Sequence, residues 1–146
     1  MSALLSRRDG GCLCGTVRFT AIPSKLEMSA CHCDQCRRWT GAVFMGVDCG
    51  TDVAIEAGEP HLGVYRSSDY GERVFCTRCG SALFWRLQDG SKIEVSAQFL
   101  DDPSGLPLAT EFFIDVKPDT YAFAGTPKTL TKAETLARMS RNGSNG

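Results

Sequence analysis

The sequence predicts a single, mainly β domain, and three observations indicate this class. Most apolar residues fall in short segments with the period-two alternation of half-buried strands. Clusters of Gly, Pro, Asp and Ser separate these segments and favour turns. Helical signals are confined to two short stretches. The length of 146 residues fits one domain with a real core and leaves no room for a second.

The first strand signal is TVRFTAI at 16–22, where Val17 and Phe19 alternate with Arg18 and Thr20. Short, turn-like connections between the strands favour antiparallel pairing. Seven further strands are predicted at 42–47, 53–57, 62–66, 73–75, 82–87, 92–99 and 111–116.

Two segments favour helix. Residues 34–38 form a short turn of helix, and Thr131 can cap a run of Ala, Glu, Leu and Arg that reaches Met139. The last residues, SRNGSNG, have the composition of a disordered tail. We therefore expect one domain over 1–130, followed by a short helix and flexible tail over 131–146.

The overall charge favours no class of partner. The chain carries 16 basic and 17 acidic residues and no basic run at either end, so we expect no nucleic-acid partner. The first residues lack the apolar core of a signal peptide, and no stretch approaches the roughly 20 apolar residues that span a bilayer. The sequence thus predicts a cytoplasmic protein without a membrane partner, and it leaves the oligomeric state open.

The eight cysteines are unusual for such a protein, because disulfides persist mainly outside the cytoplasm. Seven of them form three tight groups with the spacings C-x-C, C-x-C-x-x-C and C-x-x-C. A disulfide framework spreads its cysteines over the loops that it joins, whereas tight groups are typical of metal sites. The pattern therefore predicts metal binding, and zinc is the metal that thiolates favour.

The C-x-x-C group CTRCG can direct Cys76 and Cys79 at one ion, and Gly80 suits the tight turn. Such an ion needs two more ligands, which Cys12 and Cys14 in GGCLCG can supply from far along the chain. The result is a closed four-thiolate site. We expect a structural zinc there, whose binding contributes to the free energy of folding.

The remaining group, CHCDQC, offers Cys31, Cys33 and Cys36. Three protein ligands and one open position are typical of catalytic zinc. The side chain of His32 points away from its neighbours if the segment is extended, so we expect it beside the metal or facing a pocket rather than as the fourth ligand. His61, in GEPHLG, has the setting of a solvated loop histidine.

Sequence alone cannot pair cysteines, and two alternatives need weighing. If CHCDQC shared an ion with CTRC, then Cys12 and Cys14 would remain as an incomplete pair, which favours the first pairing. An iron-sulfur cluster could use four of the thiolates, but the C-x-C spacing and the lack of a ferredoxin-type run favour zinc. Cys49 stands alone and is predicted to be a buried apolar residue.

A zinc ion with three thiolates has a net negative charge, so it is a weak Lewis acid for water. It can still bind an incoming thiol and lower the pKa of that thiol. A fourth sulfur adds negative charge and favours a nearby cation. Arg37 and Arg38 follow Cys36 directly and are candidates, although a solvated surface pair is the alternative.

The segments GGCLCGTVRF, CHCDQCRRWTGA and CTRCGSALF together resemble the glutathione-dependent formaldehyde-activating enzyme family, also called the GFA or CENP-V family. The likeness covers the order, spacing and flanking residues of all three groups. It implies a β-tent, Mss4-like fold, a structural zinc on Cys12, Cys14, Cys76 and Cys79, and a catalytic-type zinc on the three-cysteine group.

The resemblance also implies an activity. Family members join glutathione and formaldehyde to S-(hydroxymethyl)glutathione or run the reverse carbon-sulfur lysis. The expected partner is thus a small thiol such as glutathione. The alternative function is a non-enzymatic binding or scaffold module with two structural zincs. The arginines available for glutathione carboxylates are Arg18, Arg66, Arg73 and Arg86.

Overall fold

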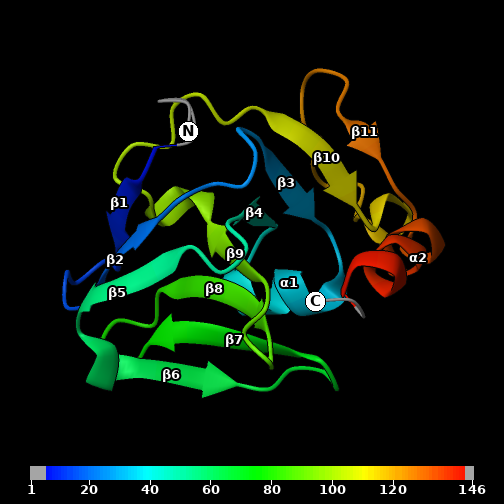
Figure 1. The fold of residues 1–146 in the computed structure, drawn as a ribbon. Helices are drawn as coiled ribbons and strands as arrows, with labels where there is room; N and C mark the ends of the chain where they lie inside the picture. The colour runs from blue at the N-terminus through cyan, green and yellow to red at the C-terminus, as the bar shows by residue number, and fades with distance from the viewer. Residues whose placement is uncertain (1–5, 144–146) are drawn as a thin grey trace.

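The structure is a computed structural model that describes residues 6–143, with side chains described over 6–140. It is mainly β, as predicted, with two sheets and few helical segments (Figure 1). The strands are β1 (Arg8–Gly11), β2 (Arg18–Ala21), β3 (Met28–Cys31), β4 (Phe44–Asp48), β5 (Val53–Ala57), β6 (Leu62–Tyr65), β7 (Gly71–Cys76), β8 (Ala82–Leu87), β9 (Ile93–Ser96), β10 (Leu108–Phe112) and β11 (Lys128–Thr129). The helices are α1 (Asp34–Thr40) and α2 (Lys132–Gly143), with 3-10 turns η2 (Glu59–His61), η3 (Ala97–Phe99) and η4 (Ile114–Val116).

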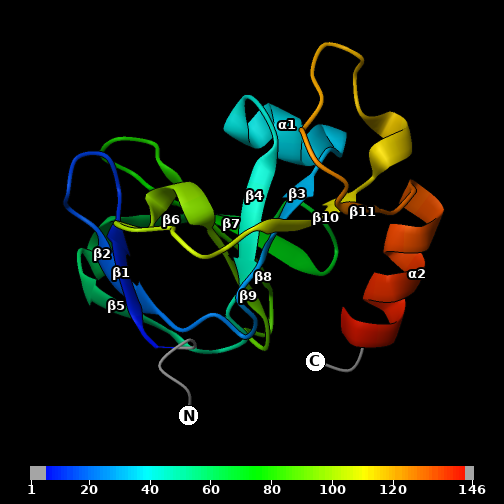
Figure 2. The same ribbon diagram turned by 90° about the horizontal axis from the view of Figure 1, so that it is seen from above.

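The smaller sheet has the strand order β1-β2-β5, and the larger sheet has the order β11-β10-β3-β4-β9-β8-β7-β6. Hairpin-like neighbours such as β7 and β8 pair antiparallel, with Arg73 opposite Trp85. From above, α1 lies at one end of β3 and β4 (Figure 2). The larger sheet therefore carries both helix α1 and the loop that precedes it.

The sheets are antiparallel, as predicted, except at strand β10. β10 runs parallel to both β3 and β11, with Phe112 opposite Cys31. The strand predicted at 111–116 ends early, because Phe113 adopts a left-handed backbone (φ 59°) that leads into η4. The end of the strand predicted at 92–99 is likewise the 3-10 turn η3.

Three short strands were missed by the sequence analysis, namely β1, β3 and β11. The glycines of β1 hide its pattern, since they carry no side chain that could alternate. Gly10 is required by close packing, because a Cβ there would lie 2.5 Å from both the Phe19 ring and the Phe99 carbonyl. The strand is thus defined by its neighbours rather than by its own residues.

The core lies between the two sheets. Its fully buried members come from five strands or their flanks, and the rings of Phe19 and Phe84 meet edge to face at 5.0 Å. The largest apolar side chains without exposure are Phe19, Leu83, Val17, Val47, Val74 and Val95. Since β2 and β7 both contribute, the core holds in place the chain segments on which the cysteine groups lie.

Helix α2 begins at the predicted cap. The Thr131 hydroxyl accepts a hydrogen bond from the Glu134 backbone N–H, and the Glu134 carboxylate accepts one from the Thr131 N–H. This reciprocal capping box satisfies two backbone donors. The helix continues past Met139 to Gly143, and the predicted tail beyond it lies outside the described residues. Among the described residues, helices are too short or too polar to cross a bilayer.

Candidate metal centres

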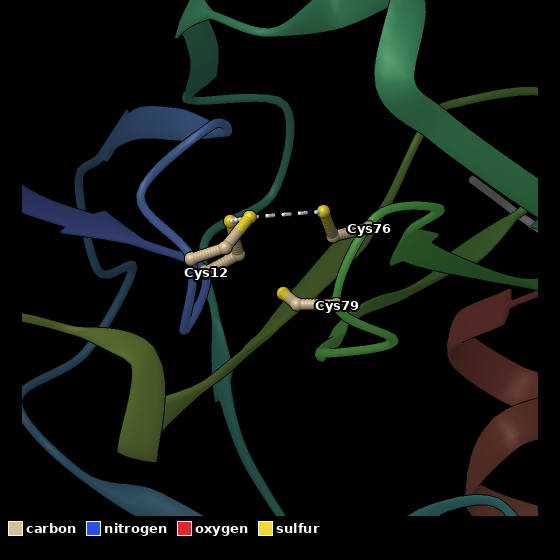
Figure 3. Close-up of side chains that lie close together, drawn as sticks. Cys12, Cys76 and Cys79 are labelled. Atoms are coloured by element: carbon tan, nitrogen blue, oxygen red, sulfur yellow. Dashed lines mark hydrogen bonds between the residues drawn. The ribbon is translucent and has the colours of Figure 1, made fainter.

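The first candidate centre brings together four sulfurs from two distant loops. Cys12 and Cys14 lie in the turn after β1, Cys76 ends β7, and Cys79 lies in the next turn. All four sulfurs lie within 4.8 Å of one another. Figure 3 shows the side chains of Cys12, Cys76 and Cys79 directed toward a common point. The predicted grouping is therefore present in the folded chain.

The spacing of these sulfurs fits a tetrahedral zinc site. Zn–S bonds of about 2.3 Å place tetrahedral sulfurs about 3.8 Å apart. The Sγ atoms of Cys12 and Cys14 are 3.6 Å apart, and those of Cys14 and Cys76 are 3.9 Å apart. The donor set and its dimensions thus match a closed four-thiolate zinc site.

Tight turns and N–H donors support the four sulfurs. The second turn closes through a 2.7 Å bond from the Gly80 N–H to the Cys76 carbonyl, and Gly80 has the positive φ (78°) that its position requires. The Val17 N–H donates to Cys12 Sγ at 3.2 Å. The Ser81 hydroxyl lies 3.2 Å from Cys79 Sγ. Such donors stabilise thiolate charge and orient metal ligands.

The same contacts favour the thiolate form. The hydrogen bond of Ser81 lowers the pKa of Cys79 to about 5. Contacts with the side chain and backbone of Thr16 lower the pKa of Cys14. Because metals bind the deprotonated sulfur, Cys14 and Cys79 suit a cation near neutral pH, whereas burial raises the pKa of Cys76.

The second candidate centre occupies the β3–α1 junction. Cys31 ends β3, Cys33 is the N-cap of α1, and Cys36 lies in its first turns. Their three sulfurs lie within 4.8 Å of one another. The cap residue is extended (φ −64°, ψ 158°), and its sulfur accepts the Cys36 backbone N–H at 3.4 Å. The β3–α1 junction thus determines the positions of all three sulfurs.

Hydrogen bonds among the three thiols of this cluster shift their pKa values in opposite directions. Hydrogen bonds from Cys31 and Cys36 lower the pKa of Cys33 to about 2, whereas donation to Cys33 and Cys36 raises the pKa of Cys31. Three thiolates this close repel one another, so full deprotonation requires a neighbouring positive charge. The cluster fits a thiophilic cation with three protein ligands.

His32 points away from the sulfurs, as predicted. Its ring is fully buried, with Nε2 2.7 Å from Glu111 Oε1 and Nδ1 2.8 Å from the Tyr121 hydroxyl. A carboxylate accepts only, so Nε2 carries the hydrogen, and in the neutral ring Nδ1 accepts the Tyr121 O–H. His32 therefore ties the three-cysteine loop to β10 and to the segment after η4.

The arginine nearest the cluster is not one of the two predicted. Arg73 of β7 donates through Nη1 to Cys36 Sγ at 3.4 Å. Arg37 instead donates through Nε to the His32 carbonyl at 3.0 Å. Arg73 lies 37 residues from Cys36 in sequence, on a strand separated from β3 by β4, β9 and β8, so the tertiary fold makes this contact and no local sequence signal could have identified it. The other candidate arginines pair with carboxylates, Arg18 with Asp101 and both Arg66 and Arg86 with Glu72.

A cavity of about 670 Å³ lies against α1. Its size is in the range of small-molecule sites, and its wall combines cationic and aromatic side chains. Both arginines that follow Cys36 line it, together with Tyr121, whose hydroxyl forms a hydrogen bond with His32. The lining residues are Asp34, Arg37, Arg38, Gly41, Ala42, Val43, Pro118, Thr120, Tyr121 and Phe123.

The two remaining candidates take no part in either cluster. Cys49 is 1% exposed and belongs to the core, as predicted, and burial raises its pKa to about 12. His61 ends η2, and its carbonyl accepts hydrogen bonds from the Thr77 N–H and hydroxyl. His61 is half-buried and lies outside the metal-type groups found among residues 6–143.

The chain is similar to proteins of one family. A family model described as glutathione-dependent formaldehyde-activating enzyme matches residues 7–116. An uncharacterized lyase of Schizosaccharomyces pombe is 31% identical over 129 residues, which are 88% of this chain and 93% of that protein. A putative glutathione-dependent formaldehyde-activating enzyme of Halomonas elongata is 32% identical over 84 residues, 52% of this chain and 54% of that one.

A solved structure shares the fold. A crystal structure of a Rhodobacter sphaeroides protein matches with a TM-score of 0.57 and 22% identity, covering 69% of this chain and 99% of that one. At this identity the likeness concerns the fold alone. It agrees with the mainly β architecture described above.

Proposed function

Because the chain belongs to the glutathione-dependent formaldehyde-activating enzyme family, we propose that it is a zinc-dependent carbon-sulfur lyase or synthase. Its substrate is a thiol–aldehyde adduct such as S-(hydroxymethyl)glutathione. The four-cysteine cluster holds a structural zinc, and Cys31, Cys33 and Cys36 hold a second zinc of the catalytic type. The reaction belongs to the cytoplasm, where free thiols are abundant.

One observation carries this proposal, namely that the second cluster has three sulfurs where the first has four. His32 is turned away into its own buried hydrogen bonds. Cys36 is buried, while Cys31 and Cys33 are half-exposed, so the cluster has an accessible side. A zinc ion held by three thiolates supplies a position for an exogenous thiol sulfur and lowers the pKa of that thiol.

The cavity on α1, whose lining includes none of the three cysteines, carries side chains that suit an anionic thiol. Arg38 is exposed at the cavity, and half-buried Arg37 joins it there, so both can attract the carboxylates of glutathione. With a neutral His32, the Tyr121 O–H donates a hydrogen bond to Nδ1, and the oxygen keeps lone pairs for a hydroxymethyl O–H. Carboxylates held at this cavity would restrict the orientations of a bound thiol.

The proposed step balances simply. The thiolate sulfur forms a bond to the aldehyde carbon, and the π electrons of the carbonyl move to oxygen. That oxygen takes up one proton, equivalent to the one that the thiol lost. The reverse reaction breaks the carbon-sulfur bond and returns thiol and aldehyde, so one site serves both directions.

Exchange NMR tests the activity, because glutathione and formaldehyde also combine without an enzyme. With ¹³C-formaldehyde and glutathione at equilibrium, the wild-type chain is expected to accelerate exchange between free and adduct carbon. Cys33→Ser should abolish the acceleration. The matched control is Cys49→Ala, which removes a buried cysteine outside both clusters and should leave the exchange rate unchanged.

Native mass spectrometry of the same samples separates the proposed enzyme from a scaffold protein. We expect two zinc ions in the wild-type chain and one in Cys33→Ser. If the wild-type chain holds two zinc ions but binds no glutathione and leaves exchange at the background rate, the enzyme proposal is wrong.

A further inference from the structure

The guanidinium group of Arg73 is held at four points beside the three-cysteine cluster. Its side chain is buried, with 4% of the residue exposed. Nη1 donates to Cys36 Sγ at 3.4 Å, Nη2 to Gln35 Oε1 at 3.2 Å and Nε to Ser67 Oγ at 3.1 Å. The carbon Cζ lies 5.1 Å from the ring centre of Trp39. This geometry fixes the direction in which the cation faces.

A buried cation needs a negative partner, since desolvation is expensive. The salt bridges between described side chains give Arg73 no carboxylate, because the adjacent Glu72 is taken by Arg66 and Arg86. Gln35 and Ser67 offer neutral oxygens only. The Cys36 sulfur is therefore the anion that Arg73 is placed to meet.

The three sulfurs differ in the hydrogen bonds that they accept from N–H donors. Cys33 Sγ accepts the Cys36 backbone N–H, and Cys36 Sγ accepts Arg73. Hydrogen bonds found within residues 6–140 give Cys31 Sγ no donor from outside the cluster. An N–H donor stabilises thiolate charge and thereby reduces its reactivity toward electrophiles.

We propose that Arg73 is a positioning residue that protects Cys36 from the electrophile, so that the aldehyde reacts with the substrate thiol instead. Without this protection, Cys36 Sγ would form a bond to the aldehyde carbon, and the carbonyl oxygen would take up a proton. The ligand would become a thioether and the cluster would lose a thiolate. This inference rests on the proposed ligand set and deepens the proposed function, because it explains how the Cys36 thiolate survives beside an aldehyde.

The test measures alkylation residue by residue. Zinc-loaded full-length chains of the wild type, Arg73→Met and Arg73→Lys are treated with excess iodoacetamide, quenched, digested and mapped by mass spectrometry. We expect alkylation of Cys36 to be about three- to tenfold faster in Arg73→Met, from the strength of a charged hydrogen bond and the dependence of thiolate reactivity on basicity. Arg73→Lys should restore most of the protection, and Cys31 should change less than twofold.

The matched control is Arg86→Met, which removes an arginine from the neighbouring strand that pairs with Glu72. It should leave Cys36 at the wild-type rate. Alkylation of Cys76 reports on folding, because this buried residue reacts only if the chain opens. A variant in which Cys31, Cys36 and Cys76 all react faster shows general opening, and the protective role is then wrong.

The zinc content of each sample separates the two proposals. If the zinc-loaded wild type and Arg73→Met alkylate Cys36 at the same rate, the role of Arg73 is overturned and the metal site stands. If the wild-type chain binds no second zinc, the proposed function fails first and the role of Arg73 fails with it.

Discussion

Nε2 of His32 lies 2.7 Å from Oε1 of Glu111, with the two side chains 0% and 8% exposed. The bond links the three-cysteine loop to β10, which runs parallel to β3 beside it. Because buried donors need acceptors, this contact sets the direction of the His32 ring and keeps it from the sulfurs. The half-exposed side of the cluster depends on a carboxylate 79 residues away in sequence.

Removal of the Glu111 carboxylate should destabilise the domain. Glu111→Ala leaves a buried N–H of His32 without its acceptor, and we expect a loss of about 3 kcal/mol in the free energy of unfolding. Glu111→Gln keeps an acceptor oxygen and should lose only about 1 kcal/mol. Urea unfolding of the zinc-loaded chain measures both, with exposed Glu59→Ala as the control. Equal losses for Gln and Ala would contradict this account.

The capping box of α2 offers a local test. Thr131→Ala removes the hydroxyl that accepts the Glu134 N–H, and we expect a loss of about 1 kcal/mol. Thr131→Ser should recover most of it, and exposed Thr126→Ala serves as the control. Thermal unfolding in a double-mutant cycle with Glu134→Ala should show a favourable coupling. Strict additivity of the two losses would argue against a reciprocal box.

The two clusters should respond differently to loss of one cysteine. Cys79→Ser removes a ligand that joins the turn after β1 to the turn after β7, so we expect an unfolded chain by circular dichroism. Cys36→Ser should remain folded and lose one zinc ion by native mass spectrometry. Chelation of the wild type should accordingly unfold it only when the second of its two ions leaves. A folded Cys79→Ser chain would overturn the structural role.

Acid should release the two ions in a set order. The pKa of Cys79 is depressed to about 5, below its unfolded value of 9.0, so its stabilisation is complete above pH 9 and is lost as the pH falls through 5. Each cluster also holds a thiol whose pKa is raised, Cys76 in the first and Cys31 in the second. The three-cysteine site has one protein ligand fewer, so we expect it to release zinc first in a stepwise titration followed with a zinc-binding dye.

Ser81→Ala tests the contribution of Cys79 to the second release. Its hydroxyl makes the largest contribution to the depressed pKa of Cys79, so its loss should move the second release to higher pH and leave the first unchanged. Simultaneous release of both ions from the wild type would contradict an order set by the number of protein ligands.

Substitution of Arg38 should raise the KM only for thiols that carry a carboxylate. In Arg38→Gln, the KM for glutathione is expected to rise by roughly fivefold, the effect of about 1 kcal/mol at an exposed site. The KM for 2-mercaptoethanol, which has no carboxylate, should stay the same in the exchange assay. A similar rise for both thiols would mean that Arg38 supports the fold of α1 rather than the substrate.

Much of the site could be predicted because its ligands are local in sequence. Cys31, Cys33 and Cys36 share one junction, and the alternation of an extended segment places His32 on the opposite side. Thr131 likewise forms its cap with a residue three positions away. Such short-range geometry follows from backbone conformation, so the sequence pattern suffices.

The contacts that surround the site could not be predicted, because they depend on strand order and register. Arg73 meets Cys36 although β4, β9 and β8 separate β7 from β3 in the sheet, so the contact depends on the tertiary fold. Glu111 reaches His32 through the parallel pairing of β10, which the alternation pattern does not reveal. Short strands such as β1, rich in glycine, are stabilised by tertiary packing and carry little signal of their own.

The unequal sequence span of the two clusters also implies an order of assembly during synthesis. Cys31, Cys33 and Cys36 leave the ribosome almost together, within six residues of chain. Cys76 follows Cys14 by 62 residues, which at about 5–20 residues per second is a delay of roughly 3–12 seconds. An ion that binds to the three-cysteine loop could therefore be captured while the chain is still growing. The four-cysteine site forms only after β7 has been made, and its closure fastens the nascent N-terminal strands to the rest of the domain.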